Sequence, residues 1–287
     1  MKKQSGFTLI ELMIAGFIGI FIMTGLMNLF ITTNKSVTLS DSLSQNQETG
    51  RFAMDYLTKF IRRAGYSEDF TNFVPPIYLA SGSGTLAITC TGTQADACAI
   101  NNPTTSPATI LGDRLSIPFS VGGNADDVTR SCTGSIVGGT ANGPQNLVNV
   151  FWVSAETANL RELRCRTFNR DTNDWLDDPV SIINNVERFE FQVGIANSEN
   201  EKFVSRYVSI DTLQADASIN INNIRSIRIA ILTTSQDELD DKKVQSTNRK
   251  RTYNLLDAPV FSIEDSNLRN IFSNTIELPN MIENANI

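Results

Sequence analysis

The feature that most constrains this chain is an apolar run near its N-terminus, Phe7–Ile31, in which Glu11 is the only charged residue. At about 1.5 Å per residue, a helix of this length exceeds the roughly 30 Å thickness of the hydrocarbon core of a bilayer. Lys2 and Lys3 precede the run, and positive charge favours the cytoplasmic side. The sequence therefore predicts one membrane-spanning helix, with the rest of the chain across the inner membrane, in the periplasm.

The residues before this run indicate how the chain is processed. A secretory signal peptide places its small-residue cleavage site after the apolar core. Here the small residue, Gly6, comes before the core, so cleavage there removes both lysines and leaves the anchor on the mature protein. Residues 6–12 (GFTLIEL) resemble the processing motif of type IV prepilins. The resemblance implies a leader of residues 1–6, cleavage between Gly6 and Phe7 by prepilin peptidase, and N-methylation of Phe7.

Glu11 is the unusual residue of the membrane segment. An ionisable side chain in a membrane costs about 2.5–3.5 kcal/mol on insertion scales and by default suggests a function. The natural partner is an ammonium group, which the new Phe7 terminus of a neighbouring subunit supplies. Such a pair fixes the axial register of packed helices, because a misplaced subunit leaves a charge unpaired in lipid. The alternative is that Glu11, about one turn into the helix, snorkels to the cytoplasmic interface.

The helix is expected to continue beyond the membrane. Residues 32–50 are polar and lack proline, and an amphipathic stripe follows at helical spacing. The stripe consists of Phe52, Ala53, Tyr56, Leu57, Phe60, Ile61 and Ala64. We expect one helix over about 7–65, broken or bent around Gly50. Its part at 7–31 spans the membrane and serves assembly, and its continuation at 32–66 packs on a globular domain.

Downstream of Tyr66 the apolar period changes from 3.6 to 2, which is typical of strands with one buried face. Alternation is clear at 163–167, 188–193 and 227–231, and further strands are predicted at 85–89, 114–121, 147–153, 203–210, 251–256 and 259–263. The stretches at 81–84, 91–107, 122–146 and 194–202 have the composition of surface loops. The predicted class is α+β: a long N-terminal helix packed on one antiparallel, β-rich head over 67–287.

Two further segments carry a narrower resemblance. Residues 50–66 resemble the end of the helix in the PilW group of minor pilins, and residues 268–280 resemble the way such chains close, with Leu-Pro-Asn at 278–280 where Leu-Arg-Asn is expected. The resemblance implies a non-enzymatic subunit with the type IV pilin fold. It implies partnership with other minor pilins, the major pilin and the inner-membrane assembly platform, in a priming or tip complex that can carry an adhesin. The subunit is stored in the inner membrane and then built into an extracellular pilus.

Two other interpretations remain at this point. The J-type minor pseudopilins of type II secretion resemble the PilW group in having an anchor helix and a β-rich head. A different class, a signal-anchored periplasmic enzyme or solute-binding protein, requires that the Gly6–Phe7 bond stays uncut.

The predicted periplasmic location of the head indicates the oxidation state of the four cysteines. Outside the cytoplasm disulfides form, and an even number allows full pairing in three connectivities. Sequence order favours Cys90 with Cys98 and Cys132 with Cys165. A zinc site is the alternative, but the chain has neither a CxxC motif nor a histidine.

Composition limits the remaining chemistry. The absence of histidine excludes Ser-His and Cys-His nucleophile systems and HExxH metal sites. A formal charge of −7 argues against a nucleic-acid partner, although residues 242–251 form one basic cluster. Residues 171–174 resemble the opening of a calcium loop, but Trp175 stands at the third ligand position. The acidic run at 237–241 has the composition of a solvated loop. We expect no enzymatic activity, no cofactor and no metal.

Overall fold

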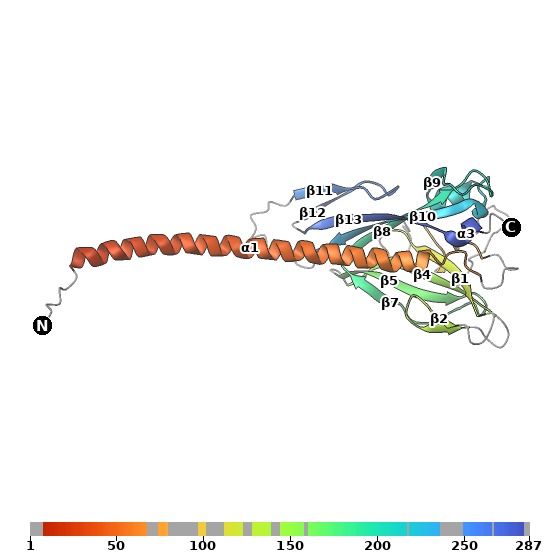
Figure 1. The fold of residues 1–287 in the computed structure, drawn as a ribbon, viewed down its shortest axis with the longest axis horizontal. Helices are drawn as coiled ribbons and strands as arrows, with labels where there is room; N and C mark the ends of the chain where they lie inside the picture. Colours follow the sequence, from red (N-terminus) through yellow and green to blue (C-terminus); the bar gives the residue numbers. More distant parts are fainter. Residues whose placement is uncertain are drawn as a thin grey trace.

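A computed structural model describes the chain over residues 8–67, 74–79, 97–101, 112–122, 128–138, 144–157, 160–216, 218–235, 249–265 and 267–283. Its dominant element is α1 (Leu9–Ile61), a single helix of 53 residues. The N-terminal half of α1 projects beyond the head, and its C-terminal half lies against the strands (Figure 1). The long helix with an antiparallel β-rich head confirms the predicted fold class.

The predicted break around Gly50 is wrong. Helical structure is uninterrupted from Leu9 to Ile61, and Gly50 lies inside it as a buried residue. A Cβ atom built on Gly50 would lie 2.2 Å from Cε2 of Phe272. The glycine therefore allows the helix to approach the head closely rather than allowing it to bend. The helix ends slightly earlier than expected, in a turn that closes at Gly65 with a φ of 74°.

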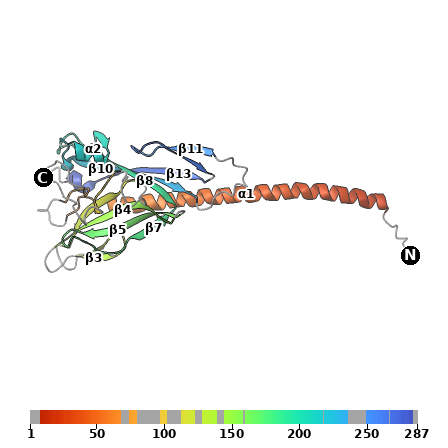
Figure 2. The same cartoon turned by 180° about the vertical axis from the view of Figure 1, so that it is seen from behind.

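Two antiparallel sheets form most of the head. One contains, in order, β1 (Leu115–Val121), β4 (Gln145–Thr157), β5 (Leu160–Asn169) and β6 (Asp174–Trp175), with β7 (Val180–Asn184) also paired to β5. The other contains, in order, β13 (Arg269–Glu277), β10 (Ile224–Thr234), β8 (Val186–Ile195) and β9 (Arg206–Val208). In both views β5 and β7 lie on one side of α1, and β8, β10 and β13 lie on the other (Figures 1 and 2).

Smaller elements complete the described part of the head. Two hairpins stand apart from the sheets, β2 (Val128–Arg130) with β3 (Ile136–Gly138), and β11 (Arg249–Tyr253) with β12 (Phe261–Asp265). Three short helical segments are α2 (Ile210–Ala215), η2 (Ile221–Asn223) and α3 (Pro279–Glu283).

The main core lies between α1 and the two sheets. It combines Ala53, Leu57 and Ile61 of the helix with residues from both sheets, all fully buried. The sheet residues at its centre include Leu115, Phe151, Leu163, Phe189, Phe191, Ile227 and Ile229. The predicted stripe on the helix is therefore mainly a core surface, although Phe52 remains 48% exposed.

Several strand predictions need correction. Strands β8 and β10 are buried on both faces rather than one, because the hairpin β11–β12 covers the outer face of β10 through Tyr253 and Leu255. The predicted loop at 122–146 contains β2, β3 and the start of β4. The predicted strand at 203–210 shortens to Arg206–Val208, and α2 begins at Ile210. The predicted strand at 85–89 lies outside the described residues.

Candidate assembly interface

The first turn of α1 is organised by Glu11. Thr8 caps the helix, and its backbone N–H and side-chain hydroxyl each donate a hydrogen bond of 2.9 Å to Oε2 of Glu11. The N–H of Glu11 donates in return to Oγ1 of Thr8 at 3.4 Å, which completes a capping box. Gly6 and Phe7 lie outside the described residues, so cleavage and methylation stay predictions. The described part of the chain thus shows a carboxylate held by its own helix, one turn from its start.

The helix beyond Glu11 presents apolar side chains on all sides. Its large hydrophobic residues between Leu9 and Ile31 are 42–79% exposed, and α1 is long and apolar enough to cross a membrane. Small residues interrupt this surface: a Cβ atom added at Gly16, Gly19 or Gly25 would meet nothing within 4 Å. An apolar surface of this size requires lipid or other helices around it.

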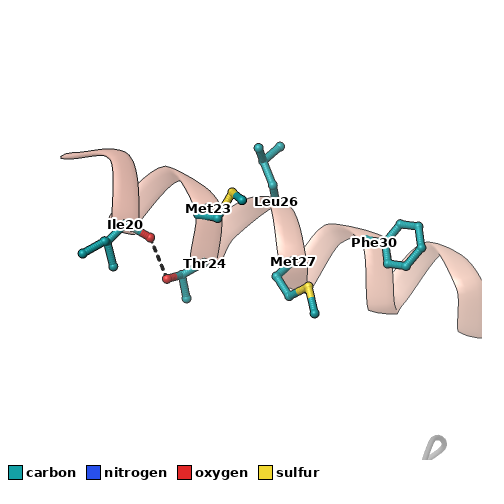
Figure 3. A pocket seen from close by; sticks show the side chains of 6 residues that line it. All are labelled: Ile20, Met23, Thr24, Leu26, Met27 and Phe30. Atoms are coloured by element: carbon teal, nitrogen blue, oxygen red, sulfur yellow. Dashed lines mark hydrogen bonds between the residues drawn. The ribbon is translucent and has the colours of Figure 1, made fainter. Parts of the chain in front are cut away.

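A shallow hollow on this helix is formed by neighbouring side chains of α1 alone. Ile20, Met23, Thr24, Leu26, Met27 and Phe30 line it (Figure 3). Thr24 donates its hydroxyl hydrogen to the carbonyl of Ile20 at 2.8 Å, so its polar group is satisfied within the helix. Every large hydrophobic residue of the set is more than half exposed. The hollow is therefore an open contact surface for packing rather than an enclosed ligand site.

A polar contact fixes the position of α1 on the head. The side chain of Asn46 is buried; its Nδ2 donates to the carbonyl of Leu268 at 3.2 Å, and its Oδ1 accepts from the hydroxyl of Thr233. At the other end of the head, Nδ2 of Asn280 donates to the carbonyl of Ala64 at 3.1 Å. Sequence reasoning missed Asn46 because it lies in a polar stretch. Its spacing from Gly50, Ala53 and Leu57 on one helix face was the available signal.

The cysteines fall into two groups. Cys98 is disulfide-bonded, and Cys90 lies outside the described residues. Cys132 and Cys165 are free thiols, both almost completely buried. The predicted bond between them is therefore not formed in this structure. The pairing of the cysteines stays a prediction.

A cysteine cluster, which we define as Tyr56, Cys132, Cys165, Thr167 and Asn149, lies where the helix meets the head. The Tyr56 hydroxyl donates to the carbonyl of Cys132, and the N–H of Cys132 donates to Oδ1 of Asn149 at 3.0 Å. Burial raises the pKa of the Cys132 thiol, and the neighbouring thiol of Cys165 raises it further. Burial likewise raises the pKa of the Tyr56 hydroxyl. Both groups are therefore neutral donors at physiological pH.

The remaining candidate sites have structural roles or lie outside the described residues. Asp171 accepts hydrogen bonds from the backbone and side-chain nitrogens of Asn146 at 2.8 and 2.9 Å, and Asp174 accepts from the N–H of Trp175 at 2.8 Å. Their carboxylates thus stabilise the turn between β5 and β6. Within the described ranges no three potential metal-ligating side chains gather. The acidic run at 237–241 and most of the basic stretch at 242–251 fall in the gap between 235 and 249.

Comparisons with known proteins give matches at both ends of the chain. The family described as Type IV Pilus-assembly protein W matches residues 150–280, and the prokaryotic N-terminal methylation motif matches residues 1–27. No curated protein matches the chain. A solved structure, the type IV-like pilin TTHA1219 from Thermus thermophilus, is 14% identical and aligns over 85% of this chain and 96% of that one, with a TM-score of 0.37.

The family match has a clear structural meaning. Residues 150–280 begin within β4 and include β5, β8, β10 and β13, the strands that enclose the core against α1. The methylation motif covers the predicted processing site and most of the exposed apolar part of α1. The two matches join a prepilin N-terminus to a PilW head in one chain. Together the two matches support a type IV minor pilin of the PilW type.

Proposed function

We propose that this minor pilin initiates assembly of the type IV pilus, in a complex with other minor pilins that remains at the tip of the fibre. The observation that carries the proposal is the combination of the PilW match with an exposed apolar helix. A subunit with this helix can join a helical bundle, and the size of its head suits a cap more than a repeated shaft position. The role is structural and needs no catalytic group.

The assembly step transfers the apolar half of α1 from lipid into a bundle of other subunits. Lipid tails are as apolar as the side chains they contact, so the transfer is driven by close packing rather than by the hydrophobic effect. Ala15, Gly16 and Gly19 permit that approach, since among the described residues nothing lies within 4 Å of a Cβ atom added at either glycine. Before assembly the head lies in the periplasm, on the side opposite Lys2 and Lys3.

Processing prepares the helix for this step. Cleavage after Gly6 by prepilin peptidase removes both lysines of the leader and gives Phe7 a free amino group, which is then methylated. In the assembled fibre this cation pairs with Glu11 of a neighbouring subunit. Thr8 already holds Oε2 of Glu11 in position within the chain, so the carboxylate is oriented before a neighbour arrives. The pair sets the register of the bundle.

Counting and measuring pili tests the initiation role. An initiator acts once per fibre, so deletion of the gene should reduce the number of pili per cell while the remaining fibres keep their length. A shaft subunit is instead incorporated in proportion to fibre length, so its loss should shorten or weaken every fibre. Normal pili together with a loss of protein secretion would contradict the proposal and favour the J-type pseudopilin function.

A further inference from the structure

The geometry of the cysteine cluster points to a disulfide between Cys132 and Cys165 that forms during folding of the head and fixes the docking site of Tyr56. This inference does not depend on the role of the subunit in initiation. Its two cysteines come from different elements: Cys132 lies in the turn between β2 and β3, and Cys165 lies in β5.

The surroundings place Cys132 directly over the face of β5 that carries Cys165. The sulfur of Cys132 lies 3.7 Å from Oγ1 of Thr167, which is two residues after Cys165 and so on the same face of the strand. Oδ1 of Asn149 accepts from the N–H of Cys132 and, at 3.2 Å, from the hydroxyl of Thr167. The thiol of Cys165 is among the neighbouring groups that raise the pKa of the Cys132 thiol. Cys132 therefore lies over the same face of β5 on which Cys165 stands.

The helix α1 closes this site. Tyr56 donates its hydroxyl hydrogen to the carbonyl of Cys132, and the thiol of Cys165 is among the groups that raise the pKa of this hydroxyl. Cys132 is 1% exposed and Cys165 is 0% exposed. An oxidant cannot reach either sulfur once the helix is docked, and burial also disfavours the thiolate that disulfide exchange requires. The bond therefore forms before the turn and the helix close over it.

The reaction balances through thiol–disulfide exchange with a periplasmic protein disulfide. One thiolate attacks that disulfide and forms a mixed disulfide, releasing one thiolate of the oxidant. The second cysteine then attacks the mixed disulfide and releases the other. The two cysteines together lose two protons and two electrons, and the oxidant becomes a dithiol.

The bond explains how an otherwise weak element is held in place. Strands β2 and β3 have only three residues each, and a hairpin of this size is marginally stable alone. The disulfide joins its turn to β5 and closes a loop of about 33 residues, which reduces the entropy of the unfolded chain. It thereby holds the Cys132 carbonyl where Tyr56 of the assembly helix binds it.

Peptide mapping of the full-length protein tests the bond directly. The protein is isolated from cells without reductant, unfolded in the presence of N-ethylmaleimide, and digested with trypsin. Cleavage after the flanking arginines gives a peptide of residues 131–161 and a dipeptide of residues 165–166, whereas Cys90 and Cys98 share the single peptide 64–114. We expect residues 131–161 linked to residues 165–166. Maleimide on both Cys132 and Cys165, or a link between Cys132 and the 64–114 peptide, would overturn the inference.

A double variant, C132S/C165S, tests the stabilising role in the same protein. The oxidised wild type should melt about 10 °C above this variant, from the loop-closure entropy. When both proteins are reduced while unfolded and refolded in reductant, most of that difference should disappear, because the disulfide of Cys98 is lost from both and the Cys132–Cys165 bond from the wild type alone. A difference that persists unchanged in reductant would contradict the inference, because it would come from packing of the sulfur atoms instead.

Discussion

Glu11 has the central part in the proposed assembly mechanism. It is one turn into the helix, its carboxylate is bound by Thr8, and all the large residues around it are apolar and exposed. A carboxylate in a membrane segment is costly, and a compensating positive charge in the mature fibre would offset that cost. The proposed partner, the Phe7 amino group of a neighbour, is the only cation that processing creates at the same depth.

Replacement of this carboxylate gives the first prediction. In Glu11→Gln the amide keeps the size of the side chain but cannot neutralise the partner's amino group. Membrane insertion should be preserved, because the cost of burying a charge is removed. The amount of the variant in sheared pili should fall at least about tenfold, the factor that corresponds to about 1.4 kcal/mol. Immunoblots of membranes and sheared pili from the same cells measure both quantities.

Glu48→Gln is the matched control for this experiment. It makes the same chemical change on the same helix, at an exposed position beyond the membrane-spanning part. Its abundance in pili should equal that of the wild type. If Glu11→Gln also enters pili at the level of the wild type, Glu11 does not set the register, and snorkelling to the interface becomes its better explanation.

Single residues were predictable from the sequence where local spacing carried the signal. The order Gly6, Phe7, Glu11 predicts processing from within seven residues, and the methylation motif matches there. The buried Asn46 has no such local signature, because its partners are the hydroxyl of Thr233 and the carbonyl of Leu268. Contacts between residues about two hundred positions apart depend on the packing of helix against sheet, which the local pattern does not contain.

At the scale of elements, α1 shows why a glycine in a helix is ambiguous. Gly50 follows a polar stretch and precedes an amphipathic one, so the sequence favoured a break there. Glycine costs a helix roughly 1 kcal/mol relative to alanine, and the cost is offset here because the ring of Phe272 fills the space that a side chain would occupy. The same local sequence is compatible with a bend in the helix or with close approach of the helix to a sheet. Only the position of β13, which carries Phe272, distinguishes the two.

Two alanine substitutions separate these roles. Gly50→Ala should lower the stability of the head by about 1–3 kcal/mol, or roughly 3–10 °C in melting temperature, because Phe272 must move. Gly25→Ala, on the part of α1 where a Cβ meets nothing, should leave the melting temperature of the head unchanged. Thermal unfolding of both full-length variants in detergent measures this. Equal melting temperatures would contradict the role assigned to Gly50.

The strands were predictable where their apolar residues alternate or form a continuous run. Strands β4, β5, β8 and β10 have ten or more residues each, and their alternation or continuous apolar run is legible. Strands β2 and β3 have three residues each, too few for a period of two to be recognised, and the nine-residue β13 was not predicted because its sequence does not alternate cleanly. Burial of both faces of β10 depends on the hairpin β11–β12, which is adjacent only in three dimensions.

At the scale of the whole molecule, the exposed half of α1 and the folded head have different roles. The exposed half of α1 is long and apolar enough to anchor the subunit in a membrane, and the head is folded around the other half through one shared core. Figure 1 shows how far the first half extends beyond the head. This division can be predicted from the sequence, because a continuous apolar run and an amphipathic stripe lie on one helix. The arrangement of the two sheets around α1 cannot be predicted in this way.

The central claim is that this chain, cut after Gly6, is built into pili through the helix that remains. The most direct measurement is intact mass and N-terminal sequencing of the protein recovered from sheared, purified pili. The account predicts a chain that begins at N-methylated Phe7, present in every pilus preparation at low abundance. Recovery only of a chain that begins at Met1, or absence of the protein from the pili, would contradict it.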